Sequence, residues 1–80
     1  MNKFNYAKLR GRIRECDFTQ AQLAKAIGVN KGTLSAKLNG QFAFTTEEVL
    51  SISQELSIPL NEIGAYFFTV RVQNSEYSSR

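Results

Sequence analysis

The sequence contains no histidine and no tryptophan, and it has a single cysteine and a single proline. Without histidine, the chain has no Ser-His or Cys-His catalytic pair and no histidine-based metal site. The lone Cys16 can form neither an internal disulfide bond nor a structural zinc site, and it fits a reducing compartment. A glycine-rich phosphate loop is also missing. The sequence therefore predicts that the protein is not an enzyme and that it holds no metal, cofactor or small-molecule ligand.

Long apolar runs are absent too, which argues against a membrane span and against a signal peptide. The 80 residues are enough for one domain with a small core. The shares of hydrophobic (42%) and charged (21%) residues are those of an ordinary globular protein. We therefore expect one soluble domain inside the cell.

The charged residues are distributed unevenly along the chain, which has a net charge of +3. Residues 1–40 hold eight Lys or Arg and two acidic residues, whereas residues 41–80 hold two Lys or Arg and five acidic residues. A basic surface kept for solubility would explain a simple excess of positive charge. The asymmetry favours instead a polyanion that binds to one face of the molecule.

Two short amphipathic helices joined by a tight turn are predicted between residues 19 and 40, TQAQLAKAIGVNKGTLSAKLNG. Thr19 and Gln22 have the spacing of a capping box at the start of the first helix. Gly28 stands where a helix commonly ends with a left-handed residue, and Asn30 can cap the second helix. Such a helix-turn-helix is typical of DNA-binding proteins.

Further helices complete an all-α fold. We expect helices over about residues 6–16, 20–27, 31–39 and 46–56, and a fifth helix that Pro59 opens. Thr45 and Glu48 form a second capping box. We also expect Phe42 and Phe44, in the loop after the third helix, to be core aromatics rather than partners for stacked bases.

The pattern changes after residue 66. Phe68, Val70 and Val72 alternate with Thr69 and Arg71, as they would in a strand. An isolated strand has no partner in a helical domain, so this segment would pair with a second copy of itself, pack as an extended arm or stay loose.

Residues 5–66 resemble the lambdoid-phage repressor and Cro type of helix-turn-helix domain, within the XRE-like group. The resemblance rests on the segment TQAQLAKAIGV, on Asn39-Gly40, on the run from Leu56 to Ile63, and on the ending EIGAYFF, which is similar to small Cro-like proteins of phages and prophages of Gram-positive bacteria. One position departs from the family pattern, because Lys37 stands where an apolar residue is usual and Leu38 takes the core role.

The resemblance implies a five-helix lambda-repressor-like DNA-binding domain over residues 1–66, followed by a C-terminal strand or arm and a tail over residues 67–80. It also implies a transcriptional regulator, a Cro-like repressor, in the cytoplasm of a bacterial host cell and associated with the nucleoid. The expected partner is a double-stranded DNA operator. Two recognition helices of a homodimer, formed at least on DNA, would address half-sites about 34 Å apart.

The third helix would enter the major groove. With Leu34 and Leu38 on its core side, the base-contact candidates are Lys31, Gly32, Ser35 and Ala36. Lysine can donate to guanine, serine can donate or accept, and alanine can meet a thymine methyl group. This surface is small, so we expect a substantial share of the specificity to come from DNA shape.

Phosphate contacts and dimer contacts are expected from other positions. The phosphate-contact candidates are Gln20, Thr33, Lys37, Asn39, Gln41, Arg10 and Arg14. The dimerisation candidates are Phe68, Val70, Val72 and Phe42.

A second interpretation keeps the fold and changes the partner. The chain could be a protein-interaction domain, or an antitoxin-type autoregulator, whose FFTVRV segment adds a strand to another protein. The basic half argues against this as the main role, because such a domain needs no basic recognition face.

Overall fold

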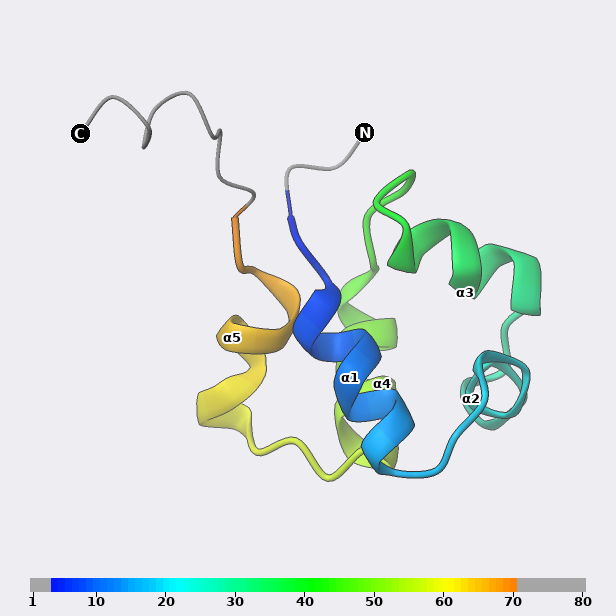
Figure 1. The fold of residues 1–80 in the computed structure, drawn as a ribbon, viewed down its shortest axis with the longest axis horizontal. Coiled ribbons are helices and arrows are strands. Elements are labelled where there is room, and N and C mark those ends of the chain that lie inside the picture. Colours follow the sequence, from blue (N-terminus) through cyan, green and yellow to red (C-terminus); the bar gives the residue numbers. More distant parts are fainter. Residues whose placement is uncertain (1–3, 71–80) are drawn as a thin grey trace.

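The computed structural model describes residues 4–70, which fold into five α-helices and a short 3-10 helix (Figure 1). The elements are α1 (Ala7–Glu15), α2 (Gln20–Ile27), α3 (Lys31–Leu38), α4 (Thr46–Glu55), η1 (Leu60–Glu62) and α5 (Ile63–Phe67). The all-α prediction is confirmed. Each helix bound lies within about two residues of its predicted position, except that the fifth helix begins as a 3-10 turn. None of the helices in residues 4–70 is long and apolar enough to span a bilayer.

The helices surround one small core. In Figure 1, α1 lies in front of α4, with α5 on one side and the α2–α3 pair on the other. Every α-helix contributes buried apolar side chains, as expected when amphipathic helices bury one face each. The core residues are Tyr6, Leu9, Ile13, Leu23, Ala24, Leu34, Leu38, Val49, Ile52, Leu56, Ile58, Tyr66 and Phe67.

Both predicted capping boxes are present. The Thr19 hydroxyl accepts a hydrogen bond from the Gln22 amide at 3.1 Å, and the Gln22 side chain accepts one from the Thr19 amide at 2.9 Å. Thr45 and Glu48 repeat the arrangement at the start of α4, with the same two distances. These bonds satisfy amides that the first turn of a helix leaves without partners, so they fix where α2 and α4 begin.

The two phenylalanines of the α3–α4 loop differ in their surroundings. Phe44 packs edge-on against Tyr6 and Phe67, with ring centroids 5.2 and 5.6 Å apart. Phe42 is 61% exposed, so the prediction that it is a core aromatic is wrong. The reason is position: Phe44 directly precedes Thr45, the capped start of α4, whereas Phe42 lies two residues earlier in the loop.

The end of the described chain pairs with its beginning. Val70 forms an isolated antiparallel bridge with Phe4, and the Asn5 amide donates to the Thr69 carbonyl at 2.7 Å. The segment that we expected to lack a partner in the chain therefore has one before α1. Phe67, which we assigned to the C-terminal arm, is the last residue of α5 and is buried. The rest of the expected strand, residues 71 and 72, lies outside the described residues.

Candidate nucleic-acid interface

The turn between α2 and α3 has the geometry that the sequence predicts. Gly28 adopts a left-handed conformation, with φ of 78°. The next amide, of Val29, then donates back to the Ala24 carbonyl at 2.9 Å, which closes the end of α2. The Asn30 side chain accepts from the Gly32 amide at 2.7 Å and starts α3. Because Ala24 is small and fully buried, α3 can cross close to α2 at this point.

The outward face of α3 carries the predicted base-contact residues. Leu34 and Leu38 are buried and anchor the helix. The other side is polar or small: Lys31 and Gly32 are exposed, and Ser35 and Ala36 are half-buried. Among the flanking phosphate-contact candidates, Thr33, Asn39 and Gln41 are exposed. The structure thus brings these side chains to one helix and the loop that follows it, and their contacts with DNA stay predictions.

Gly32 has a reason within the chain to be glycine. A Cβ atom built at this position would lie 3.1 Å from Oδ1 of Asn30, the oxygen that caps α3. Such a contact is tighter than most Cβ contacts in proteins, so with a larger residue the Asn30 oxygen would have to shift by a few tenths of an ångström. The absence of a side chain here therefore leaves room for the cap that starts α3.

Lys37 lies at the C-terminal end of α3 and is occupied by an ion pair. Its ammonium group is 2.6 and 2.7 Å from the two carboxylate oxygens of Glu48 on α4. Both side chains are largely buried, at 13% and 16% exposure. Burial by itself raises the pKa of Glu48, but the hydrogen bonds from Lys37 and Thr45 and the charge of Lys37 outweigh it and lower the pKa. The predicted contact of Lys37 with a phosphate would compete with its ion pair to Glu48.

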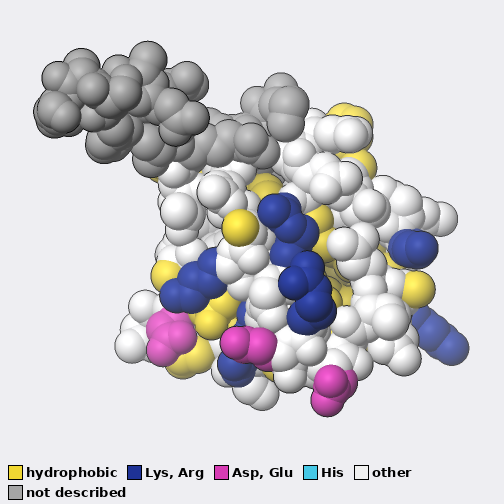
Figure 2. Space-filling model, in the orientation of Figure 1, with side chains coloured by type: hydrophobic (Ala, Val, Ile, Leu, Met, Phe, Trp, Pro, Cys, Tyr) yellow, Lys and Arg dark blue, Asp and Glu magenta, His cyan; other side chains and the backbone are white. Residues whose placement is uncertain are grey.

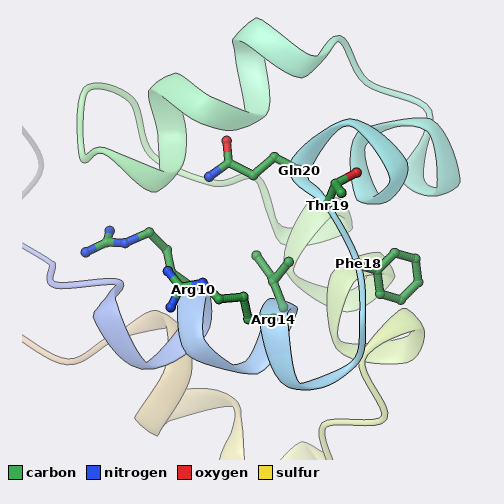
Figure 3. Close-up of a pocket in the computed structure, with 6 residues that line it drawn as sticks. Arg10, Arg14, Phe18, Thr19 and Gln20 are labelled. Carbon is green, nitrogen blue, oxygen red and sulfur yellow. The ribbon is translucent and has the colours of Figure 1, made fainter.

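Three other phosphate-contact candidates meet in one cleft between α1 and the start of α2. The cleft is lined by Arg10, Ile13, Arg14, Phe18, Thr19 and Gln20. In Figure 3, the side chains of Arg10, Arg14 and Gln20 extend toward the same side, while Phe18 points away. The cleft thus joins two arginines to the first turn of α2, and both the positive charges and the helix dipole attract an anion.

Two arginines of α1 cap the ends of other helices, which the sequence analysis did not foresee. Arg10 Nη1 donates to the Leu38 carbonyl, at the end of α3, at 2.8 Å. Arg12 donates to the Leu56 carbonyl, at the end of α4, from Nε at 3.1 Å and Nη2 at 2.9 Å. These pairs are 28 and 44 residues apart, so no local pattern predicts them.

Lys and Arg side chains gather on one part of the surface, where Glu15 of α1 pairs with Arg12 at 3.5 Å. Figure 2 shows Lys and Arg side chains gathered over α1, with acidic side chains toward the lower edge. Between Leu38 and Val70 the sequence has four glutamates and no Lys or Arg. The region of α4, η1 and α5 is therefore acidic. Within residues 4–70, no three His, Cys, Asp or Glu side chains gather as metal ligands would.

An apolar groove lies in this acidic region, between α4 and α5. Its lining is Phe44, Thr46, Val49, Leu50, Ile63 and Phe68. Leu50 and Phe68 are each 51% exposed, and the neighbouring Val70 is 54% exposed. Three dimerisation candidates, Phe42, Phe68 and Val70, are thus accessible, whereas Val72 lies outside the described residues. Exposed apolar side chains around a groove are typical of a protein contact.

Comparisons with known proteins match the chain to a family model and to a solved structure. A family model with the description "Protein of unknown function (DUF739)" matches residues 2–70. The chain is also similar to the solution structure of the modulator of repression (MOR) of the temperate bacteriophage TP901-1 from Lactococcus lactis. That similarity has 32% sequence identity and a TM-score of 0.71, and it covers 89% of this chain and 96% of the other. No match was found among the curated proteins.

Proposed function

The chain belongs to the DUF739 family, and from this premise we propose that it is a small phage regulatory protein that modulates repression by binding double-stranded operator DNA through α3. The observation that carries the proposal is the exposed, polar face of α3, a helix that Asn30 caps at its start. The cleft of Arg10, Arg14 and Gln20 adds positive charge beside it. The name of the TP901-1 protein, a modulator of repression, supports the regulatory role. The proposal assigns the chain no catalytic role and no cofactor.

In this proposal α3 enters the major groove by its N-terminal half. Lys31 donates to guanine, and Ser35 and Ala36 meet neighbouring base edges. Arg14 and Gln20 bind one phosphate in the cleft, and Thr33, Asn39 and Gln41 flank the groove. The ammonium group of Lys37 stays with Glu48, so we leave it out of the phosphate contacts.

A homodimer on a pseudo-palindromic operator would complete a Cro-type repressor. Two copies of α3 would then address half-sites about 34 Å apart. The accessible side chains of Phe42, Phe68 and Val70 are apolar enough to join the two copies. Such a regulator acts in the bacterial cytoplasm, on the nucleoid.

The test is the binding of the protein to duplex DNA from its own upstream region and to a scrambled duplex, by fluorescence anisotropy across a salt series. We expect tighter binding to the upstream duplex, and we expect Lys31→Ala and Ser35→Ala each to reduce that preference by about five- to tenfold. Lys25→Ala is the matched control, because it removes an equal charge from an exposed site on α2 outside the proposed contacts. Equal binding to both duplexes at moderate salt would exclude sequence-specific DNA recognition.

The apolar groove favours a second candidate function, the binding of a protein partner. The groove would take an apolar anchor, and the glutamates around it favour a partner with basic residues beside that anchor. A reporter gene under a phage promoter distinguishes regulation through DNA binding from regulation through a protein partner. Loss of regulation in Lys31→Ala, with regulation kept in Leu50→Asp, supports DNA binding, and the reverse pattern supports the protein partner.

A further inference from the structure

Two kinds of contact hold α3 to the rest of the domain, buried side chains and polar bonds. Of its eight residues, α3 buries two, Leu34 and Leu38. Polar bonds hold its C-terminal end from two sides: Lys37 pairs with Glu48 of α4, and Arg10 of α1 donates to the Leu38 carbonyl. These bonds therefore help to fix the orientation of α3, together with its two buried leucines.

The bond from Arg10 fills a specific gap at the end of α3. The carbonyls of Ala36 and Lys37 accept from the amides of Gln41 and Gly40, at 2.9 and 3.0 Å. Leu38 is the last residue of the helix, and its carbonyl accepts from Arg10 Nη1 at 2.8 Å. A guanidinium group also complements the negative end of the helix dipole. Because this bond is partly buried, water competes with it less than with an exposed bond.

Arg10 is at the same time a wall of the cleft that faces the start of α2. A guanidinium group carries five N–H donors in a fixed fork, and the bond to Leu38 uses one of them. The remaining donors allow the same side chain to bind an anion in the cleft beside Arg14 and Gln20 (Figure 3). One residue thus touches both the recognition helix and the proposed phosphate site.

We propose that Arg10 is a positioning residue that couples phosphate binding in the cleft to the orientation of α3. A phosphate held by Arg10 fixes the guanidinium group, which in turn fixes the end of the recognition helix. A backbone contact, which ordinarily sets register alone, here contributes to discrimination between sequences. This inference rests on the proposed DNA binding.

The test compares Arg10→Lys with Arg14→Lys in the anisotropy assay with the upstream and scrambled duplexes. Both variants keep the charge, but a lysine cannot hold the carbonyl and a phosphate with one rigid fork. We expect Arg10→Lys to reduce the ratio of the two affinities by about tenfold, the size of one charge-assisted hydrogen bond, with an unchanged salt slope. We expect Arg14→Lys to weaken binding to both duplexes by the same factor, since Arg14 makes no hydrogen bond to α3 among residues 4–70.

Amide hydrogen exchange in the absence of DNA gives an independent reading. We expect faster exchange at Asn39, Gly40 and Gln41 in Arg10→Lys and wild-type exchange there in Arg14→Lys. An Arg10→Lys protein with wild-type discrimination and wild-type exchange would overturn the proposal. If the wild-type protein itself does not discriminate, the proposed function fails and the specificity role of Arg10 fails with it, while faster exchange in Arg10→Lys would still identify Arg10 as the tether of α3.

Discussion

Lys37 Nζ donates to both carboxylate oxygens of Glu48, at 2.6 and 2.7 Å. This ion pair links the end of α3 to the start of α4. The same carboxylate accepts from the Thr45 amide at 2.9 Å, as the second half of the capping box. One side chain therefore serves two helices. The loop between them, residues 39–45, is fixed at both ends by this single group.

Glu48→Gln separates these two roles. Glutamine keeps the capping box, because its side-chain oxygen can still accept from Thr45, but it loses the ion pair. We expect unfolding free energy at pH 7 to fall by about 1–3 kcal/mol, since the lost partner leaves the largely buried Lys37 without its counter-charge. Urea denaturation measures the change.

The ion pair between Lys37 and Glu48 should make the stability of the fold depend on pH. The pKa of Glu48 in the folded protein lies below the ordinary value of 4.5. The pair therefore stabilises the fold fully above that value, and this contribution is lost as the pH falls through the lower folded-state pKa. We expect the difference between wild type and Glu48→Gln to shrink on acidification below pH 4.5. A difference that stays constant down to pH 2 would contradict the assignment.

Ser57 strains the end of α4, so Ser57→Gly should stabilise the protein. Its φ is 56°, a left-handed conformation that costs a residue with a side chain about 1–2 kcal/mol. The amides of Ser57 and Ile58 close the helix by donating to the carbonyls of Gln54 and Ser53, so the conformation is required. After the added entropy of the unfolded glycine chain, we expect a net gain of about 0.5–1 kcal/mol, which thermal unfolding measures.

A glycine inside the same helix is the control. Gln54→Gly, in α4 with exposed surroundings, should lose about 0.5–1 kcal/mol, because glycine is a poor helix former where φ is helical. Equal losses in Ser57→Gly and Gln54→Gly would show that the left-handed residue carries no strain.

Local patterns of the sequence predicted the features that depend on neighbouring residues. Thr19 and Gln22 are three residues apart, so their capping box follows from spacing alone, and Gly28 is the residue that a left-handed helix end favours. The same reasoning missed the left-handed Asp17 and Ser57, because neither is glycine and the tertiary packing imposes their conformation.

Local patterns could not predict contacts between residues that are far apart in the sequence. Arg10 and Arg12 look like solvated charges of an amphipathic helix, and only the packing of α1 against the ends of α3 and α4 brings them to the carbonyls of Leu38 and Leu56. Lys37 was predicted to bind phosphate because it flanks the third helix, and nothing in the sequence indicates that Glu48 pairs with it. For the candidate site, the sequence predicted which residues lie on the outward face of α3. Only the structure shows that Lys37 and Arg10 already bind groups within the chain.

Ser53 holds a buried hydroxyl group that finds no hydrogen-bond partner among the described residues. An unpaired buried polar group costs free energy, so Ser53→Ala should leave stability unchanged or raise it, by up to about 1 kcal/mol. Ile52→Ala, at the adjacent and fully buried position, is the contrast and should lose about 2–5 kcal/mol through the cavity it creates. A marked loss in Ser53→Ala would mean that the hydroxyl group has a partner.

Substitutions at Gly11 and Gly32 form a matched pair that tests the start of α3. Both lie within helices, and alanine is the better helix former by about 1 kcal/mol. A Cβ at Gly11 meets nothing within 4 Å, so we expect Gly11→Ala to gain about that amount in denaturation experiments.

At Gly32 the added Cβ would press on the oxygen of Asn30 that caps α3, at 3.1 Å. Loss of a cap costs about 1 kcal/mol, which cancels the gain in helix propensity. We therefore expect Gly32→Ala to change stability little, and to speed amide exchange at Gly32 and its neighbours in the first turn. If Gly32→Ala instead stabilises the protein as much as Gly11→Ala, the cap tolerates the methyl group. Glycine at this position would then be explained by what approaches α3 from outside rather than by the helix itself.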